Sequence, residues 1–242
     1  MELELGSFRS IRAFAERFLA EHDTLHILVN NAGVMACPFD TTEDGFEMQF
    51  GTNHLGHFLL TNLLIPALLN GAPSRIVILS SAAHQRSPVV FEDIHYQQRP
   101  YNKWHSYGQS KSANVLHAVE LERRLGFNGV HAYAVHPGGI QTELSRHMLK
   151  EDWDMIRSRI ASGAFRLKTV AAGAATSVYA ATAPELEGRG GFYLHDCQIA
   201  DVNDDETVSG GVRSYAIDPN AAQHLWVLSF QMVGQVFPSI HG

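Results

Sequence analysis

A tyrosine and a lysine four residues apart are the pair in this sequence best suited to proton transfer. Tyr107 and Lys111 stand in the stretch Ser-Tyr-Gly-Gln-Ser-Lys, at the start of a predicted helix. Residues i and i+4 of an α-helix lie on one face, one turn apart. An ordinary tyrosine has a pKa of about 10 and a nearby cation lowers it, so the pair predicts a phenol that can exchange a proton. Such pairs also occur on helix surfaces, and the surrounding residues must decide between the two interpretations.

The elements expected around this pair alternate between strands and helices. Buried strands are predicted at 25–29, 75–79, 130–135 and 191–194, and helices at 8–20, 44–69, 107–125, 169–183 and 219–233. This alternation is typical of an α/β fold with a doubly wound parallel sheet. The carboxyl ends of parallel strands meet at one edge of the sheet, where such folds bind ligands. We therefore expect the residues that follow the strands to form one site with Tyr107.

Composition excludes several classes of function. With 45% hydrophobic and 18% charged residues in 242, the chain is expected to form a single globular domain over residues 1–242. A net charge of −7 gives no sign of nucleic-acid binding. Cys37 and Cys197 form neither a disulfide framework nor a zinc motif, which favours a reducing, cytoplasmic compartment. His54 and His57 have no carboxylate or cysteine at a spacing that completes a metal site. No apolar run reaches membrane-spanning length.

In order and spacing, these residues resemble the short-chain dehydrogenases/reductases. The resemblance covers essentially the whole chain and rests on five features: Asn30-Asn31-Ala32-Gly33, Asn53 on the next helix, Ser80-Ser81 ending a strand, Tyr107-x-x-x-Lys111, and Pro137-Gly138 followed by Thr142. The stretches 75–84 and 107–116 look most like the retinol dehydrogenase and WW-domain oxidoreductase branch.

The resemblance implies a role for each catalytic residue. Tyr107 would act as general acid/base, and Lys111 would lower the pKa of Tyr107 and bind the nicotinamide ribose. Ser81 would bind the substrate oxygen, and Asn53 would hold a water linked to Lys111. The residues implied to line the cofactor, besides Tyr107 and Lys111, are Glu4, Leu5, Asn31, Ala32, Gly33, Pro137, Gly138 and Thr142.

The same resemblance implies the ligands. The cofactor is expected to be NADP(H) rather than NAD(H), and the substrate a small, lipophilic alcohol or carbonyl compound. The amphipathic composition of the stretch 144–168 suits a substrate lid, and it suits an ordinary pair of surface helices equally well. Trp104 and His105, just before Tyr107, are expected to pack at the rim of the pocket. The pattern favours no particular oligomeric state.

The glycine-rich turn with which the family begins is not in this sequence. We therefore expect a truncated Rossmann-like domain that lacks its first strands, from an amino-terminally truncated or mis-started reading of a longer enzyme. The strand at 25–29 would then be an open edge, so the chain is expected to be poorly soluble and not to bind NADP(H). The alternatives to an oxidoreductase are a non-catalytic interaction module and a fragment without activity.

Overall fold

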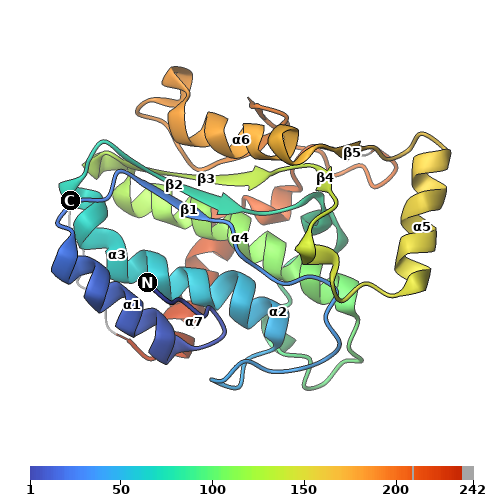
Figure 1. Ribbon diagram of the computed structural model, residues 1–242, viewed down its shortest axis with the longest axis horizontal. Helices are drawn as coiled ribbons and strands as arrows, with labels where there is room; N and C mark the ends of the chain where they lie inside the picture. Colours follow the sequence, from blue (N-terminus) through green and yellow to red (C-terminus); the bar gives the residue numbers. More distant parts are fainter. Residues whose placement is uncertain (209, 236–242) are drawn as a thin grey trace.

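The computed structural model describes residues 1–208 and 210–235 and shows an α/β fold built on a five-stranded sheet (Figure 1). The strand order is β1-β2-β3-β6-β7, with bounds β1 Ile27–Asn30, β2 Ser74–Leu79, β3 Val130–His136, β6 Phe192–His195 and β7 Gln198–Ile199. The first four strands are parallel and β7 is antiparallel to β6. All six residues of β2 are buried, as expected for a central strand covered on both faces.

Helices cover both faces of the sheet (Figure 1). One face carries α1 (Phe8–Glu21), α3 (Gly56–Asn70), α4 (Lys103–Leu125) and α7 (Pro219–Val233), and the other carries α6 (Val170–Thr182). The larger hydrophobic core lies beneath the first group, and a smaller core lies between the sheet and α6. A further helix, α5 (Lys150–Ala161), stands beyond the carboxyl ends of the strands (Figure 1). None of the helices described is long and apolar enough to cross a bilayer.

Local sequence signals place most of these elements. The side chain of Ser7 caps α1 by accepting a hydrogen bond from the Ser10 amide. Asp218 caps α7, whose first residue is Pro219. The four predicted strands and five predicted helices all form, with ends shifted by a few residues. The short pair of β4 (Gly139–Ile140) and β5 (Leu167–Lys168) and the antiparallel β7 were not predicted.

Two predicted helices have boundaries that are wrong. The helix expected over 44–69 is divided into a short turn, α2 (Met48–Phe50), a π-helical turn, η1 (Gly51–Leu55), and α3. The Glu47 carboxylate fixes the start of α2 by accepting hydrogen bonds from two of its amides. The helix that carries Tyr107 begins at Lys103, because Asn102 provides the cap. Residues 1–5 belong to no strand.

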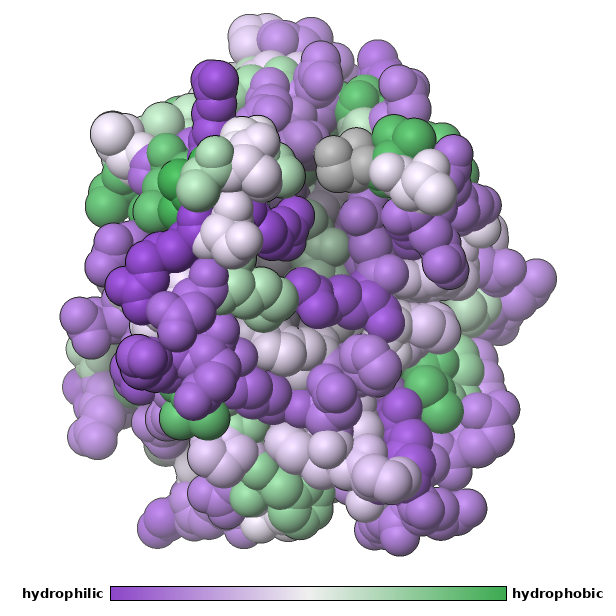
Figure 2. All heavy atoms as spheres, turned by 90° about the vertical axis from the view of Figure 1, so that its right-hand side faces the viewer, coloured by the Kyte–Doolittle hydropathy of each residue, from purple (hydrophilic) through white to green (hydrophobic). Residues whose placement is uncertain are grey.

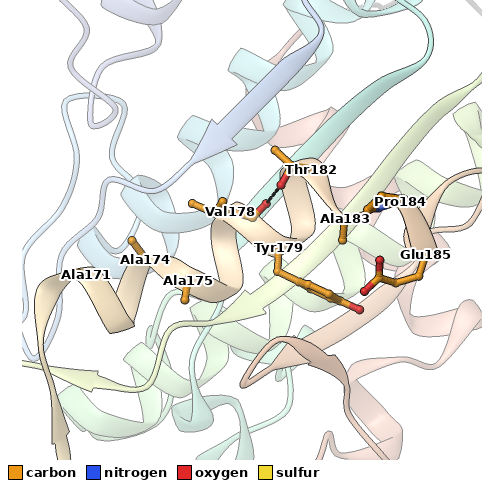
Figure 3. A pocket seen from close by; sticks show the side chains of 9 residues that line it. All are labelled: Ala171, Ala174, Ala175, Val178, Tyr179, Thr182, Ala183, Pro184 and Glu185. Carbon is orange, nitrogen blue, oxygen red and sulfur yellow. Dashed lines mark hydrogen bonds between the residues drawn. The ribbon is translucent and has the colours of Figure 1, made fainter.

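The strand β1 lies at the edge of the sheet and pairs only with β2 in the part of the chain described. Ile27 and Val29 are each 44% exposed on it. On the outer side of α6, Val178 is 57% exposed. It lines a shallow, open depression of about 510 Å³ together with Ala174 and Tyr179 (Figure 3). The predicted open edge is therefore present in the structure.

Candidate active site

The residues expected to do chemistry meet where β2 ends and α4 begins. Tyr107 and Lys111 are both buried on α4, at 4% and 5% exposure. The side chain of Ser81, which directly follows β2 and begins a 3₁₀ turn, η2 (Ala82–Arg86), acts to lower the pKa of Tyr107 against the larger effect of burial. Ser81 Oγ accepts a hydrogen bond from the Ala83 amide at 3.1 Å. The structure thus brings the predicted serine and tyrosine to the same end of β2.

The ammonium of Lys111 is held by the carboxyl end of β2. Its Nζ donates to the Leu79 carbonyl oxygen at 2.9 Å, and the same oxygen accepts from Asn114 Nδ2 at 3.0 Å. Ser80 Oγ donates to the Lys111 carbonyl at 2.8 Å, which fixes the helix backbone against the strand. The Nζ atom lies 5.5 Å from the centre of the Tyr107 ring. Lys111 therefore lies beside the phenol ring while its charge is bonded to the strand.

Burial sets the protonation states of this pair. It raises the pKa of Tyr107 to about 12, against the opposing effect of the Ser81 side chain. It lowers the pKa of Lys111 to about 8. The sequence predicted a lowered pKa for Tyr107, and for this structure that direction is wrong: desolvation dominates while Lys111 is bonded to Leu79. At neutral pH the site holds a neutral phenol beside an ammonium.

Asn53 is buried in η1, and its side chain fastens two segments together. Its Oδ1 accepts from the Val34 amide at 2.9 Å, while Nδ2 donates to the Val34 carbonyl at 2.9 Å and to Ser110 Oγ at 3.0 Å. Both side-chain N–H groups are therefore used within the protein. The side chain thereby joins the segment after β1 to α4, and the water linked to Lys111 stays a prediction.

The segment after β1 offers an accessible backbone. Asn31 and Ala32 are exposed, and Gly33 is half-buried. A Cβ atom on Gly33 would lie 2.7 Å from Asn53 Oδ1, so glycine is needed for this close approach. Two other residues that were implied to line the cofactor, Glu4 and Leu5, make contacts within the protein. Glu4 accepts from the Gly6 amide through its carboxylate, and Leu5 is buried in the core.

The loop after β3 is covered by the segment that follows α5. Gly138 has a φ of +89° and lies against the side chain of Lys168, while Gly139 lies against the ring of Phe165. Lys168 itself forms an ion pair with Asp196. At the far end of the loop, Thr142 Oγ1 accepts from the Leu144 amide at 3.3 Å. The Pro137-Gly138 loop is thus at the edge predicted, with the stretch 144–168 extending from it.

Two contributors were missed by the sequence analysis. His136 Nδ1 accepts from the Ala82 amide at 3.2 Å, which joins the loop after β3 to the segment after β2. Its position directly before Pro137-Gly138 was the available signal. Asp152 on α5 accepts from the Trp104 indole at 3.1 Å and thereby reaches the start of α4. No local pattern marks that contact, since the partners are 48 residues apart.

The face of the molecule that carries the site is mainly hydrophilic and is hollowed near its middle (Figure 2). It is the side toward which the parallel strands point, and on which α5 stands, in Figure 1. Because α/β folds bind ligands outside the carboxyl ends of their strands, the position of this recess agrees with the site built from the residues.

Comparisons with known proteins agree with this site. A family model described as short chain dehydrogenase matches residues 1–153. Retinol dehydrogenase 14 of Mus musculus is 45% identical over 233 residues, which cover 96% of this chain and 66% of that protein. Retinol dehydrogenase 12 of Mus musculus is 46% identical over 235 residues, with 96% and 69% covered. A crystal structure of an uncharacterized protein from Mycobacterium Paratuberculosis superposes with a TM-score of 0.70 at 34% identity, covering 98% of this chain and 76% of that one.

The chain spans about two thirds of the length of the retinol dehydrogenases it matches. The similarity in sequence and in fold nevertheless extends along 96% and 98% of this chain, respectively. This protein belongs to the short-chain dehydrogenase family and is a homologue of the retinol dehydrogenases.

Proposed function

We propose that this protein is part of an NADP(H)-dependent oxidoreductase that interconverts a lipophilic alcohol and its carbonyl compound, with Tyr107 as general acid/base. The observation that carries the proposal is the convergence of Ser81, Tyr107 and Lys111 at the end of β2, with the Lys111 ammonium 5.5 Å from the centre of the phenol ring. The lipophilic substrate class is supported by the names of the relatives, which are retinol dehydrogenases.

Each residue has a defined task in the direction of carbonyl reduction. Ser81 and the Tyr107 hydroxyl together bind the carbonyl oxygen. Tyr107 is protonated at neutral pH, because burial raises its pKa, and it gives its proton to the oxygen as negative charge develops there. The Lys111 ammonium stabilises the phenolate that remains. A bound nicotinamide cofactor would supply the hydride for this reaction.

The residues present fit one end of such a cofactor. The exposed backbone of Asn31 and Ala32 and the small residue Gly33 allow close approach at the end of β1. Pro137, Gly138 and Thr142 stand at the end of β3, on the same edge of the sheet, where the nicotinamide end would be held. Lys111 would bind the adjacent ribose, exchanging its bond to Leu79 for one to the sugar.

We further propose that the open edge of β1 pairs with a strand of a glycine-rich nucleotide-binding segment. Support comes from Ile27 and Val29, apolar and 44% exposed on that edge, and from the exposed apolar side chains of α6. Apolar area of this kind on a sheet edge is usually covered. Such a segment would account for part of the third of the retinol dehydrogenases that this chain does not match, and it would complete the cofactor cleft.

A direct test compares the chain alone with the chain fused behind a strand, glycine-rich turn and helix from a relative. The fusion is expected to bind NADP(H) and to oxidise a lipophilic alcohol, and the chain alone to do neither. In the fusion, Tyr107→Phe is expected to lower turnover about 10²- to 10⁴-fold while leaving cofactor affinity unchanged. Unchanged turnover in Tyr107→Phe would remove this residue from the mechanism. Tight cofactor binding by the chain alone would refute the need for the added segment.

A further inference from the structure

The helix α5 is attached to the rest of the protein by a carboxylate. Of its 12 residues only Asp152 is buried. The apolar side chains of Met155 and Ile160 are 41% and 39% exposed. An element that buries so little apolar surface gains little from the hydrophobic effect. The placement of α5 therefore depends on the hydrogen bonds that Asp152 makes.

Those bonds use both carboxylate oxygens. Oδ2 accepts from Lys103 Nζ at 2.5 Å and from the Leu149 amide at 2.8 Å, and Oδ1 accepts from Trp104 Nε1 at 3.1 Å. Burial by itself would raise the pKa of Asp152, and the bonds from Lys103, Leu149 and Trp104 lower it below its ordinary range. Asp152 is thus an ionised, almost fully satisfied acceptor that caps its own helix and joins it to α4.

The two side chains that it holds lie beside the candidate catalytic residues. Lys103 and Trp104 are the first residues of α4, and Tyr107 follows Trp104 by three positions, which places them on neighbouring turns of one helix face. Two cations lie near the Trp104 ring, with Arg86 Cζ at 5.5 Å and Lys103 Nζ at 5.8 Å from its centre. Arg86 ends the turn that begins after Ser81. The indole therefore reaches from the helix that carries Tyr107 to the turn that follows Ser81.

We propose that Asp152 is a positioning residue: by holding Lys103 and Trp104 it fixes α5 as a cover and the indole as an apolar wall beside Tyr107 and Ser81. The three side chains Asp152, Lys103 and Trp104 form what we call the Asp152 latch. Its structural part stands on the observed bonds alone. Its substrate part, in which the wall contacts the lipophilic portion of the alcohol or carbonyl compound, rests on the proposed function.

Hydrogen exchange measured by mass spectrometry tests the structural part in the chain as it is. In Asp152→Asn an uncharged amide replaces the carboxylate and presents an NH₂ group to the Lys103 ammonium, so exchange over 150–161 is expected to become at least about tenfold faster. Lys103→Met removes the same ion pair from the other side and is expected to have the same effect. Asp154→Asn is the matched control, because Asp154 is on the same helix and pairs only with exposed Lys150 and Arg157. Wild-type exchange over 150–161 in both test variants would overturn the latch.

Kinetics in the fusion with the nucleotide-binding segment test the substrate part. Asp152→Asn is expected to raise KM for a lipophilic alcohol about tenfold with kcat changed less than about twofold, and Asp154→Asn to change neither. Faster exchange over 150–161 with an unchanged KM would show that Asp152 holds α5 in place but that the Trp104 indole does not contact the substrate. If the wild-type fusion has no turnover at all, the proposed function fails, and the exchange measurement alone still decides whether the latch exists.

Discussion

The Lys111 ammonium donates a hydrogen bond to the Leu79 carbonyl oxygen, 2.9 Å away, so its charge is held at the end of β2. Tyr107, one turn earlier on α4, has the raised pKa of a buried phenol. This arrangement favours proton donation over proton removal at neutral pH. It follows that carbonyl reduction and alcohol oxidation should respond to pH in opposite ways.

The first prediction is the pH profile of the fused enzyme. Lys111, with a pKa lowered to about 8, is charged below that pH and loses its proton as pH rises through it, whereas Tyr107 keeps its proton up to about 12. Reduction should therefore be constant below pH 8 and decline above it, since the phenolate left behind loses its neighbouring charge. Lys111→Arg keeps its charge over this range and should abolish the decline. Initial rates between neutral pH and pH about 10 measure this, and a flat wild-type profile would contradict it.

The second prediction concerns acid stability. Six buried or half-buried histidines have lowered pKa values, chiefly through burial: His54, His57, His84, His95, His117 and His136. A lowered pKa in the folded state means that the unfolded state binds more protons below pH about 6.5. The free energy of unfolding should therefore be fully present above that pH and fall as pH drops toward 4. Denaturant titrations across this range measure the slope.

One variant isolates a single histidine in this effect. His117 is buried on α4, and its ring faces Trp226 of α7. Neither of its ring nitrogens has a hydrogen-bond partner among the described residues. His117→Phe should reduce the acid slope by about 1.4 kcal/mol per pH unit and raise stability at neutral pH, because it removes two unsatisfied polar atoms. His26→Gln, at an exposed position, is the control. A loss of stability at neutral pH would show that His117 has a partner, such as an internal water.

The third prediction concerns the contact between Gly33 and Asn53. A methyl group on Gly33 would lie 2.7 Å from Asn53 Oδ1 and would force that side chain off the Val34 backbone. Gly33→Ala should lower the free energy of unfolding by about 1–3 kcal/mol. Gly6→Ala is the matched control, since its Cβ would meet nothing nearer than 3.5 Å. Equal stability of the two variants would contradict the contact.

The fourth prediction concerns the open edge of β1. An exposed apolar edge strand invites pairing with another chain, and a lysine on it opposes such pairing. Val29→Lys should therefore reduce self-association of the unfused chain in sedimentation velocity. Val227→Lys, at a similarly exposed position on α7, should not. If both lysines reduce association equally, added charge and not the edge is responsible.

Much of the fold could be predicted because its signals are local. The caps Ser7 and Asp218 lie next to the helices they start, and β2 is an unbroken buried run. Boundaries failed where a distant group intervened. The start of α2 depends on the Glu47 carboxylate, which Tyr101 also bonds from 54 residues away, and no hydrophobic period reports such a contact.

By itself the sequence determined the alternation of strands and helices, the shared helix face of Tyr107 and Lys111, and the order of motifs that indicates a dehydrogenase. The alternation and the shared helix face follow from periodicity, capping and spacing, and the order of motifs indicates a dehydrogenase through its resemblance to the family. Only the tertiary structure decided that Tyr107 stays protonated, that Asn53 bonds Ser110 across 57 residues, and that Asp152 holds the start of α4. Burial and hydrogen-bond partners are set by segments distant in sequence, so the site's residues were readable in advance and its electrostatics were not.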